Sequence, residues 1–230
     1  MNAVMVYGSP NKKDSASYRL GSSFGKGLEA GGWQTSEIVI YEKEINHCIG
    51  CKSCWSATPG KCVQNDDMAG ILDLLSNANL VVMSVPLYFF MVPGKTKDYL
   101  DRHMPMFYQT VLKMYGKATQ DWIDKIKFVL IGACGYPQKS YFGGMKLSFQ
   151  HIFGKAYAAD FFVTNSAGLS ADINCTEFKE YYQMMEKLGT EFGKNMTVSP
   201  QTMAEFEKLT EMDNPKIADM RERLAKLQNS

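Results

Sequence analysis

The chain of 230 residues has almost no excess charge and no long apolar segment. Lys plus Arg number 25 and Asp plus Glu number 24, so the net charge of +1 offers no electrostatic basis for binding nucleic acid or an anionic membrane. The longest apolar stretch, residues 80–92, is interrupted by Ser84 and Pro86 and is shorter than the ~20 residues of a membrane-spanning helix. The amino terminus lacks an export pattern. We therefore expect a cytoplasmic protein with neither nucleic acid nor membrane as partner.

Two sequence motifs narrow the chemistry further. The one G-x-S-x-G match, Gly21 to Gly25, lies inside the first predicted helix and not at a strand-to-helix turn, so the nucleophile elbow of a Ser–His–Asp hydrolase is missing. The chain also has no G-x-G-x-x-G fingerprint for a dinucleotide. The histidines His47, His103 and His151 share no metal-ligand spacing, and no residue stands out as a general base. These absences favour chemistry carried by a bound cofactor.

The apolar pattern predicts a layered α/β protein. Hydrophobic residues make up 45% and charged residues 21%, which fits a globular chain and excludes a disordered one. Short apolar runs alternate with amphipathic stretches, and strands are predicted at 3–7, 36–41, 80–85, 128–133 and 160–164. Their nearly continuous apolar character is typical of parallel strands covered on both faces. The pattern predicts a doubly wound, five-stranded parallel sheet with helices on both faces, in either the Rossmann or the flavodoxin-like order.

Two segments exceed this minimal fold. The first is an insertion at 103–127 that carries Phe107, Tyr108, Tyr115 and Trp122. Its apolar surface predicts a homodimer or a higher homo-oligomer. The second is a charged tail from Pro200 to Ser230 with a helical pattern divided at Pro215, which is either a solvated appendage or an oligomer contact. We expect one domain over 1–195 and a helical C-terminal extension over 196–230.

The loop after the first predicted strand is rich in hydroxyl groups. It begins with Gly8-Ser9-Pro10 and continues through Asn11 to Ser15 and Ser17, where a helix is predicted to start. Backbone amides at a helix start, with serine hydroxyls as further donors, form a binding site for a phosphate group. The same residues are also those of ordinary helix capping and turns, and this alternative has equal weight on the sequence alone.

The third predicted strand ends in an apolar, aromatic lip. Its residues are Pro86, Leu87, Tyr88, Phe89 and Phe90, and Cys134-Gly135-Tyr136 follows the fourth strand as a further wall. Ligands of open α/β sheets bind beyond the carboxyl ends of the strands. Because three successive aromatic residues cannot all point into the core, the lip is suited to a flat ring.

Four cysteines lie in one short segment, at 48–62. Cys48, Cys51 and Cys54 have C-x-x-C-x-x-C spacing, and Cys62 completes four thiolates, the number that a cubane iron–sulfur cluster needs. Structural zinc normally uses two separated pairs instead. A redox dithiol and the remnant of a lost cluster site remain as alternatives. Cys134 and Cys175 lie elsewhere and are expected to be ordinary buried thiols.

Taken in order, these motifs resemble one family. Gly8-Ser9-Pro10, the serines at 15 and 17, the run from Ile45 to Cys54, Asp66-Asp67-Met68, Pro86 to Phe89 and Gly94 to Arg102 resemble the NAD(P)H-dependent FMN reductases, and most closely their iron–sulfur flavoprotein branch. The resemblance covers residues 1 to about 170. It implies a flavodoxin-like fold.

The resemblance also implies cofactors and their sites. FMN phosphate would bind at Ser9, Asn11, Ser15 and Ser17 next to Tyr18. The isoalloxazine ring would lie beside Pro86, Leu87, Tyr88 and Phe89 and beside Cys134, Gly135 and Tyr136. A [4Fe-4S] cluster on Cys48, Cys51, Cys54 and Cys62 would lie near the flavin, with NAD(P)H as the transient donor and a small molecule or ferredoxin as partner. The alternatives are a cluster-free FMN or quinone reductase and a flavodoxin-type electron carrier.

Overall fold

The computed structural model describes residues 1–118, 121–166 and 178–211. Within these ranges a five-stranded sheet has the order β2-β1-β3-β4-β5, and every neighbouring pair is parallel. The strands are β1 (Asn2–Tyr7), β2 (Gln34–Val39), β3 (Leu80–Pro86), β4 (Lys127–Ala133) and β5 (Tyr157–Val163). This 2-1-3-4-5 order is the flavodoxin-like one, so the choice left open by the sequence pattern is settled.

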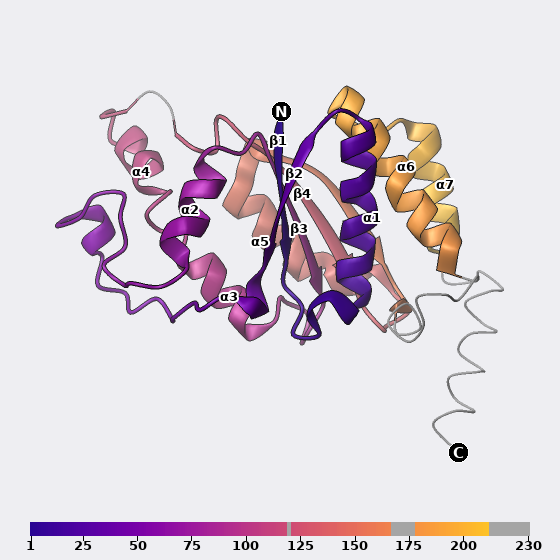
Figure 1. Cartoon of the computed structure of the whole chain (residues 1–230), viewed down its shortest axis with the longest axis horizontal. Helices are drawn as coiled ribbons and strands as arrows, with labels where there is room; N and C mark the ends of the chain where they lie inside the picture. Colours follow the sequence, from indigo (N-terminus) through magenta and orange to yellow (C-terminus); the bar gives the residue numbers. More distant parts are fainter. Residues whose placement is uncertain (119–120, 167–177, 212–230) are drawn as a thin grey trace, which may run out of the picture.

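Helices cover both faces of the sheet (Figure 1). One face carries α1 (Ala16–Ala30), α6 (Lys179–Asn195) and α7 (Pro200–Leu209). The other carries α2 (Met68–Ser76), α3 (Gly94–Asp101) and α5 (Gly143–Phe153), with α4 (Tyr108–Met114) beyond them. Short 3-10 turns occupy Lys12–Asp14, Ile40–Glu42, Ser53–Trp55, Lys139–Phe142 and Gly154–Ala156. No helix in the described ranges has both the length and the apolar character needed to cross a bilayer.

The alternation of side chains along each strand explains the two cores. In β1, Val4 and Val6 point into the core under α2, α3 and α5, whereas Met5 and Tyr7 point into the core under α1 and α6. Successive strand residues face opposite sides, so a run of five apolar residues supplies both layers at once. The second strand begins and ends two residues earlier than predicted, because the chain enters a 3-10 turn at Ile40.

Glycines bring α1 and α6 into close contact. A Cβ atom on Gly27 would collide with the carbonyl oxygen of Glu186, and one on Gly189 would collide with that of Phe24. Trp33, just after α1, donates from Nε1 to the carbonyl of Gly193 (2.8 Å). The backbones of the two helices therefore touch where larger side chains would hold them apart.

The insertion and the tail both contribute to the core. Trp122 is buried and donates from Nε1 to the carbonyl of Leu75 (3.1 Å), so the insertion covers the end of α2. Tyr115 remains exposed. In α7, Phe206 is 2% exposed and packs edge-on against Phe161, so this part of the tail is a packed helix rather than a solvated one. Cys175 and the predicted break at Pro215 lie outside the described residues.

Candidate functional site

The loop between β1 and α1 is tightly organised by its own serines. Ser15 caps α1: its Oγ accepts from the amide of Tyr18 (3.1 Å) and donates to the carbonyl of Lys12 (2.8 Å). The hydroxyls of Ser15 and Ser17 lie 3.2 Å apart, and the side chain of Ser9 accepts from the amide of Asn11 (3.3 Å). The helix-capping role that the sequence left as an alternative is therefore confirmed for Ser15. It orients hydroxyls and amides at one helix start.

Two fully buried hydroxyl groups fix this loop to the sheet. Ser84, on β3, donates to the carbonyl of Ser17 (2.6 Å), and Thr96, on α3, donates to the carbonyl of Gly8 (2.8 Å). The amide of Gly8 in turn donates to the carbonyl of Ser84 (3.0 Å). A Cβ on Gly8 would lie 2.6 Å from Thr96 Oγ1, so only glycine allows this approach. The backbone of the loop is thus held before any ligand arrives.

The lip after β3 is a two-residue hairpin with unusual backbone angles. Tyr88 and Met91 exchange both backbone hydrogen bonds (2.8 and 3.0 Å), while Phe89 and Phe90 have φ of +50° and +64°. Hairpins of this kind normally place Asn or Gly at the two central positions, because larger residues are strained there. Phe89 is 96% exposed, and the ring of Phe90 is stacked with that of Tyr136 at 6.3 Å. The lip therefore presents aromatic rings outward.

These segments meet in one small cavity of about 130 Å³ at the carboxyl ends of β1, β3 and β4. Its lining residues are Ser9, Asn11, Ser15, Ala16, Ser17, Pro86, Leu87, Tyr88, Ala133, Cys134, Gly135 and Ser166. Three residues of the predicted site are not among them: Tyr18, Phe89 and Tyr136. Tyr18 packs on Tyr7 and reaches Glu37 with its hydroxyl (3.3 Å), because its place on the helix turns it away from the strand ends.

Among the described residues, the walls of this cavity carry no carboxylate, histidine, lysine or arginine. Burial raises the pKa of the Cys134 thiol to about 11, so it stays protonated at neutral pH. Hydroxyls and amides at a helix start suit the anionic phosphate of FMN, and Pro86 and Leu87 suit the face of its ring. The residues present therefore fit a flavin mononucleotide.

The cysteine segment between β2 and α2 extends away from the sheet (Figure 1). Cys48, Cys51, Cys54 and Cys62 are free thiols and all four line one cavity of about 170 Å³. Burial raises the pKa of Cys54, and Cys62 beside it adds to the effect, so thiols from both arms of the segment are close enough to interact. The remaining walls are largely apolar, with Trp55 among them.

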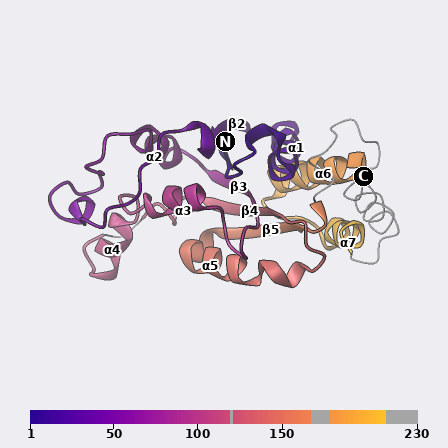
Figure 2. The same cartoon turned by 90° about the horizontal axis from the view of Figure 1, so that it is seen from below.

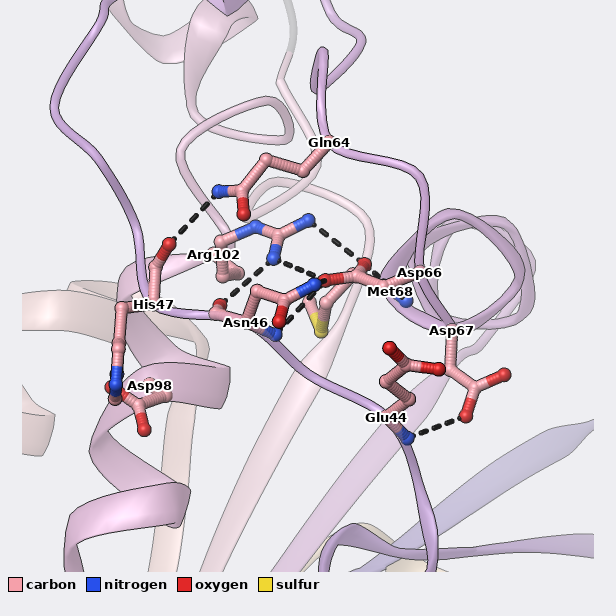
Figure 3. A network of polar contacts seen from close by, with 9 residues as sticks. All are labelled: Glu44, Asn46, His47, Gln64, Asp66, Asp67, Met68, Asp98 and Arg102. Atoms are coloured by element: carbon pink, nitrogen blue, oxygen red, sulfur yellow. Dashed lines mark hydrogen bonds and ion pairs between the residues drawn. The ribbon is translucent and has the colours of Figure 1, made fainter.

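A buried ion pair holds the base of this segment (Figure 3). Arg102 Nη1 and Nη2 bond the two oxygens of Asp66 at 2.6 and 2.9 Å, and both side chains are at most 1% exposed. Nη1 also donates to the carbonyl of Asn46 (2.9 Å), whose amide donates back to Asp66 (2.9 Å). Burial opposes the carboxylate, but the bonds from Arg102 outweigh it and lower the pKa of Asp66. We call Asn46, Asp66 and Arg102 the clasp.

Further contacts tie the two arms of the cysteine segment to each other and to the body of the protein. Gln64 Nε2 donates to the carbonyl of His47 (2.9 Å), directly linking the residues beside Cys62 and Cys48. Trp55 donates from Nε1 to the carbonyl of Met104 (2.8 Å). The first and last cysteines are therefore brought together by bonds that do not involve sulfur.

Four thiols on one cavity are the donor set that an iron–sulfur cluster requires, so the residues fit such a group. Among the described residues, no three His, Cys, Asp or Glu side chains converge closely enough to hold a single metal ion.

The flavin and cysteine cavities lie at opposite ends of α3, and they share no lining residue. Thr96 in the first turn of α3 contacts the first loop, whereas Arg102, just after α3, lines the cysteine cavity. An eight-residue helix is ~12 Å long. The cysteine segment follows this end of α3, because the clasp fastens it there. The cluster near the flavin that the resemblance implies stays a prediction.

Sequence reasoning missed the residues that act from behind the two cavities. Ser84, Thr96 and Asp66 line neither cavity, Arg102 lines the cysteine cavity, and the partners of all four are distant in the chain. Asp66 and Arg102 did appear in the motifs that carried the resemblance. Charged residues of opposite sign within such motifs are the signal that could have suggested a pair.

Comparison with known proteins agrees with this geometry. Residues 1–164 match the protein family described as having a flavodoxin-like fold. An iron-sulfur flavoprotein of Archaeoglobus fulgidus is 35% identical over 113 residues, covering 49% of this chain and 50% of that protein. Another, of Methanocaldococcus jannaschii, is 30% identical over 106 residues, covering 46% of this chain and 53% of that protein. The chain thus spans about half the length of these relatives.

Solved structures show the same fold at low sequence identity. An FMN-dependent NADH-azoreductase from Bacillus anthracis, in complex with FMN, has a TM-score of 0.59 at 16% identity, covering 84% of this chain and 100% of that one. An NAD(P)H:quinone oxidoreductase from Methanothermobacter marburgensis has a TM-score of 0.57 at 14% identity, covering 86% of this chain and 97% of that one. At this identity the likeness establishes the architecture alone.

Proposed function

We propose, from the premise that the chain belongs to the flavodoxin-like fold family, that it is an FMN-dependent oxidoreductase that also carries a [4Fe-4S] cluster. It would move electrons between a reduced donor, NAD(P)H or ferredoxin, and a small acceptor. The observation that carries this proposal is the meeting of the first loop, the lip and the Cys134-Gly135 segment in one cavity. The names of the relatives support the cluster.

The chemistry supplied by bound FMN is hydride acceptance followed by release of electrons one at a time. The residues of the chain would bind the phosphate and orient the ring. Ser9, Asn11, Ser15 and Ser17 would hold the phosphate, with the loop backbone already fixed by Ser84 and Thr96. Pro86, Leu87 and Tyr88 would orient the ring against Cys134 and Gly135, and Phe89 and Tyr136 would extend this aromatic surface outward. The wall residues that the structure describes place no charged side chain beside the ring.

The cluster would supply one-electron storage on Cys48, Cys51, Cys54 and Cys62. Arg102 lines the same cavity as the four thiols. The clasp and the Gln64–His47 bond would hold the first and last thiolate at the spacing the group needs. Since the two cavities of one chain lie at opposite ends of α3, a homodimer or higher homo-oligomer is part of this proposal.

Flavin binding is tested by replacing the first-loop serines. We expect the purified protein to bind one FMN per chain, and Ser15→Ala with Ser17→Ala to weaken FMN tenfold or more, since a hydrogen bond to a charged group contributes about 1.5–3 kcal/mol. Ser23→Ala, on α1 away from the cavity, is the matched control. Fluorescence titration measures both. An unchanged dissociation constant in the double variant would remove the first loop from the flavin site.

The cluster is tested separately and without oxygen. Protein purified and reconstituted anaerobically should contain iron and sulfide, and Cys54→Ser should lose both while retaining FMN. Cys175→Ser serves as the control, because that cysteine lies outside the segment 48–62. If wild-type protein handled in this way contains no iron, the proposal of a cluster is wrong and a cluster-free FMN or quinone reductase takes its place.

Light scattering of the same sample measures the oligomeric state. NADH or NADPH oxidation distinguishes an enzyme from an electron carrier.

A further inference from the structure

A cavity bordered by the aromatic insertion is distinct from both cofactor sites. It measures about 630 Å³ and lies between α3, α4 and α5, near the insertion residues that follow α3. Ligand pockets for small molecules typically measure ~300–1,000 Å³. It shares no residue with the flavin cavity, but Asp101 and Met104 line both it and the cysteine cavity. Figure 2 shows α4 and α5 on the same side of the sheet, with α3 beside them.

The walls of this cavity are mainly aliphatic and aromatic. They include Leu100, Phe107, Ile123, Phe149, Ile152 and Phe153. Of the charged residues that line it, Lys97 and Asp101 pair with each other at 2.7 Å, and Asp121 accepts a hydrogen bond from the backbone amide of Asp124 at 2.9 Å. Such walls favour an uncharged ring system over an ionic ligand.

Two polar groups on the apolar wall give the cavity its chemistry. His103 is buried, and its Nδ1 lies 2.7 Å from the carbonyl of Tyr99. A carbonyl only accepts, so Nδ1 carries the proton. Burial lowers the pKa of His103 to about 4, so the ring is neutral and Nε2 has a free lone pair. The ring can therefore accept one hydrogen bond from a ligand.

Thr110 supplies the second group. Its Oγ1 is buried and has no hydrogen-bond partner among the described residues. A helical threonine commonly donates to the carbonyl four residues earlier, but for Thr110 that carbonyl belongs to Met106, before α4 begins. A buried hydroxyl without a partner costs about 1–3 kcal/mol, and a ligand that pairs with it removes the cost.

We propose that this cavity is a second ligand site, for an uncharged aromatic molecule that carries a hydroxyl group, a phenol or a hydroquinone. The ring of the ligand packs among the apolar walls, and its hydroxyl donates to His103 Nε2 while Thr110 pairs with an oxygen of the ligand. Since Asp101 and Met104 line both cavities, the ligand lies across these side chains from the four cysteines. The site does not depend on the proposed function, because it uses none of the cofactor residues.

The test uses FMN-saturated protein, so that the flavin cavity is filled, and two probes titrated by calorimetry. 1-Naphthol should bind once per chain. 1-Methoxynaphthalene, which cannot donate a hydrogen bond, should bind at least about fivefold more weakly, the loss expected for one neutral hydrogen bond. Thr110→Val should weaken 1-naphthol by about the same factor. The control, Thr190→Val, removes a threonine hydroxyl on α6 far from the cavity and should change nothing.

Filling the cavity gives the decisive comparison. Ile152→Trp should abolish 1-naphthol binding while FMN remains bound, which also shows that the variant is folded. If that variant does not retain FMN, the comparison is made with Thr110→Val and Thr190→Val. Failure of 1-naphthol to bind wild-type protein up to about 1 mM overturns the proposal. Equal binding to wild type and to Ile152→Trp, or equal binding to both threonine variants, places the probe elsewhere and overturns it as well.

Discussion

The first loop and the cysteine segment hold their candidate ligands in opposite ways. The first loop is short, its serines at 9, 15 and 17 are at most 5% exposed, and neutral hydrogen bonds from Ser84 and Thr96 fix its backbone. The cysteine segment is longer, Cys48 and Cys51 are exposed, and a buried ion pair fixes only its base. The first is complete before a ligand binds. The second is fixed at its base by charge, and single hydrogen bonds from Gln64 and Trp55 hold its arms.

Breaking the clasp gives the largest expected effect. It should impair the cysteine segment and leave the first loop intact. Asp66→Asn leaves the buried Arg102 without its partner, and removing one member of a buried pair costs about 3–5 kcal/mol. Urea denaturation should show this loss, and anaerobic reconstitution should yield little iron, while FMN affinity in the folded protein stays near that of wild type.

Asp101→Asn is the matched control for the clasp, since its partner Lys97 is half exposed and such pairs contribute at most about 1 kcal/mol. Equal destabilisation by the two substitutions would mean that the clasp contributes no more than a surface pair. Loss of FMN together with iron would show that the two regions are not independent.

Acid should lower the free energy of unfolding of the protein through His103. The folded pKa of about 4 lies below the ordinary value of 6.5, so the unfolded state binds more protons between these values. Stability is therefore lost as the pH falls from 6.5 towards 4, by roughly 3 kcal/mol in all. Urea midpoints across this range measure the slope.

His103→Phe keeps a ring in the same place and cannot titrate. Its urea midpoint should vary less with pH between 6.5 and 4 than that of wild type, after allowance for the constant loss of the bond to Tyr99. Parallel slopes for the two proteins would assign the acid sensitivity to other groups. His151→Phe, at an exposed position on α5, is the control.

Loosening the first loop should have the smallest effect. Thr96→Val keeps the shape of the side chain but leaves the carbonyl of Gly8 without its donor, at a cost of about 1–2 kcal/mol. We expect FMN affinity to fall severalfold while iron content stays unchanged, the reverse of the Asp66 result. Thr190→Val again serves as the control. An unaltered FMN dissociation constant would show that the loop keeps its form without Thr96.

The sequence was most informative where contacts are local. Apolar runs such as 80–85 predicted the strands, and the family resemblance drawn from ordered motifs is confirmed by the family match and by the relatives. Ser9 and Pro86 meet as predicted, because the carboxyl ends of neighbouring parallel strands share an edge. Side-chain direction was harder to predict. Phe89 points outward because of a left-handed turn that no spacing rule reveals.

Contacts between residues far apart in the chain could not be predicted from the sequence either. Asp66 and Arg102 come together only because α2 and α3 lie on the same face of the sheet, and helical periodicity carries no information about such a contact. The separation of the two cavities follows from the same pairing. Once Arg102 binds Asp66 and Asn46, the cysteines can only lie near the far end of α3.

The glycine contact between α1 and α6 has a consequence for synthesis on the ribosome. Gly27 emerges long before Gly189, yet the two backbones touch in the finished protein. Until α6 has been translated, Phe24 and Leu28 lack the helix that covers them, although β1, β2 and β3 are already present. The nascent chain must therefore carry a half-covered sheet through most of its elongation, which is the stage at which a holding chaperone would be most useful.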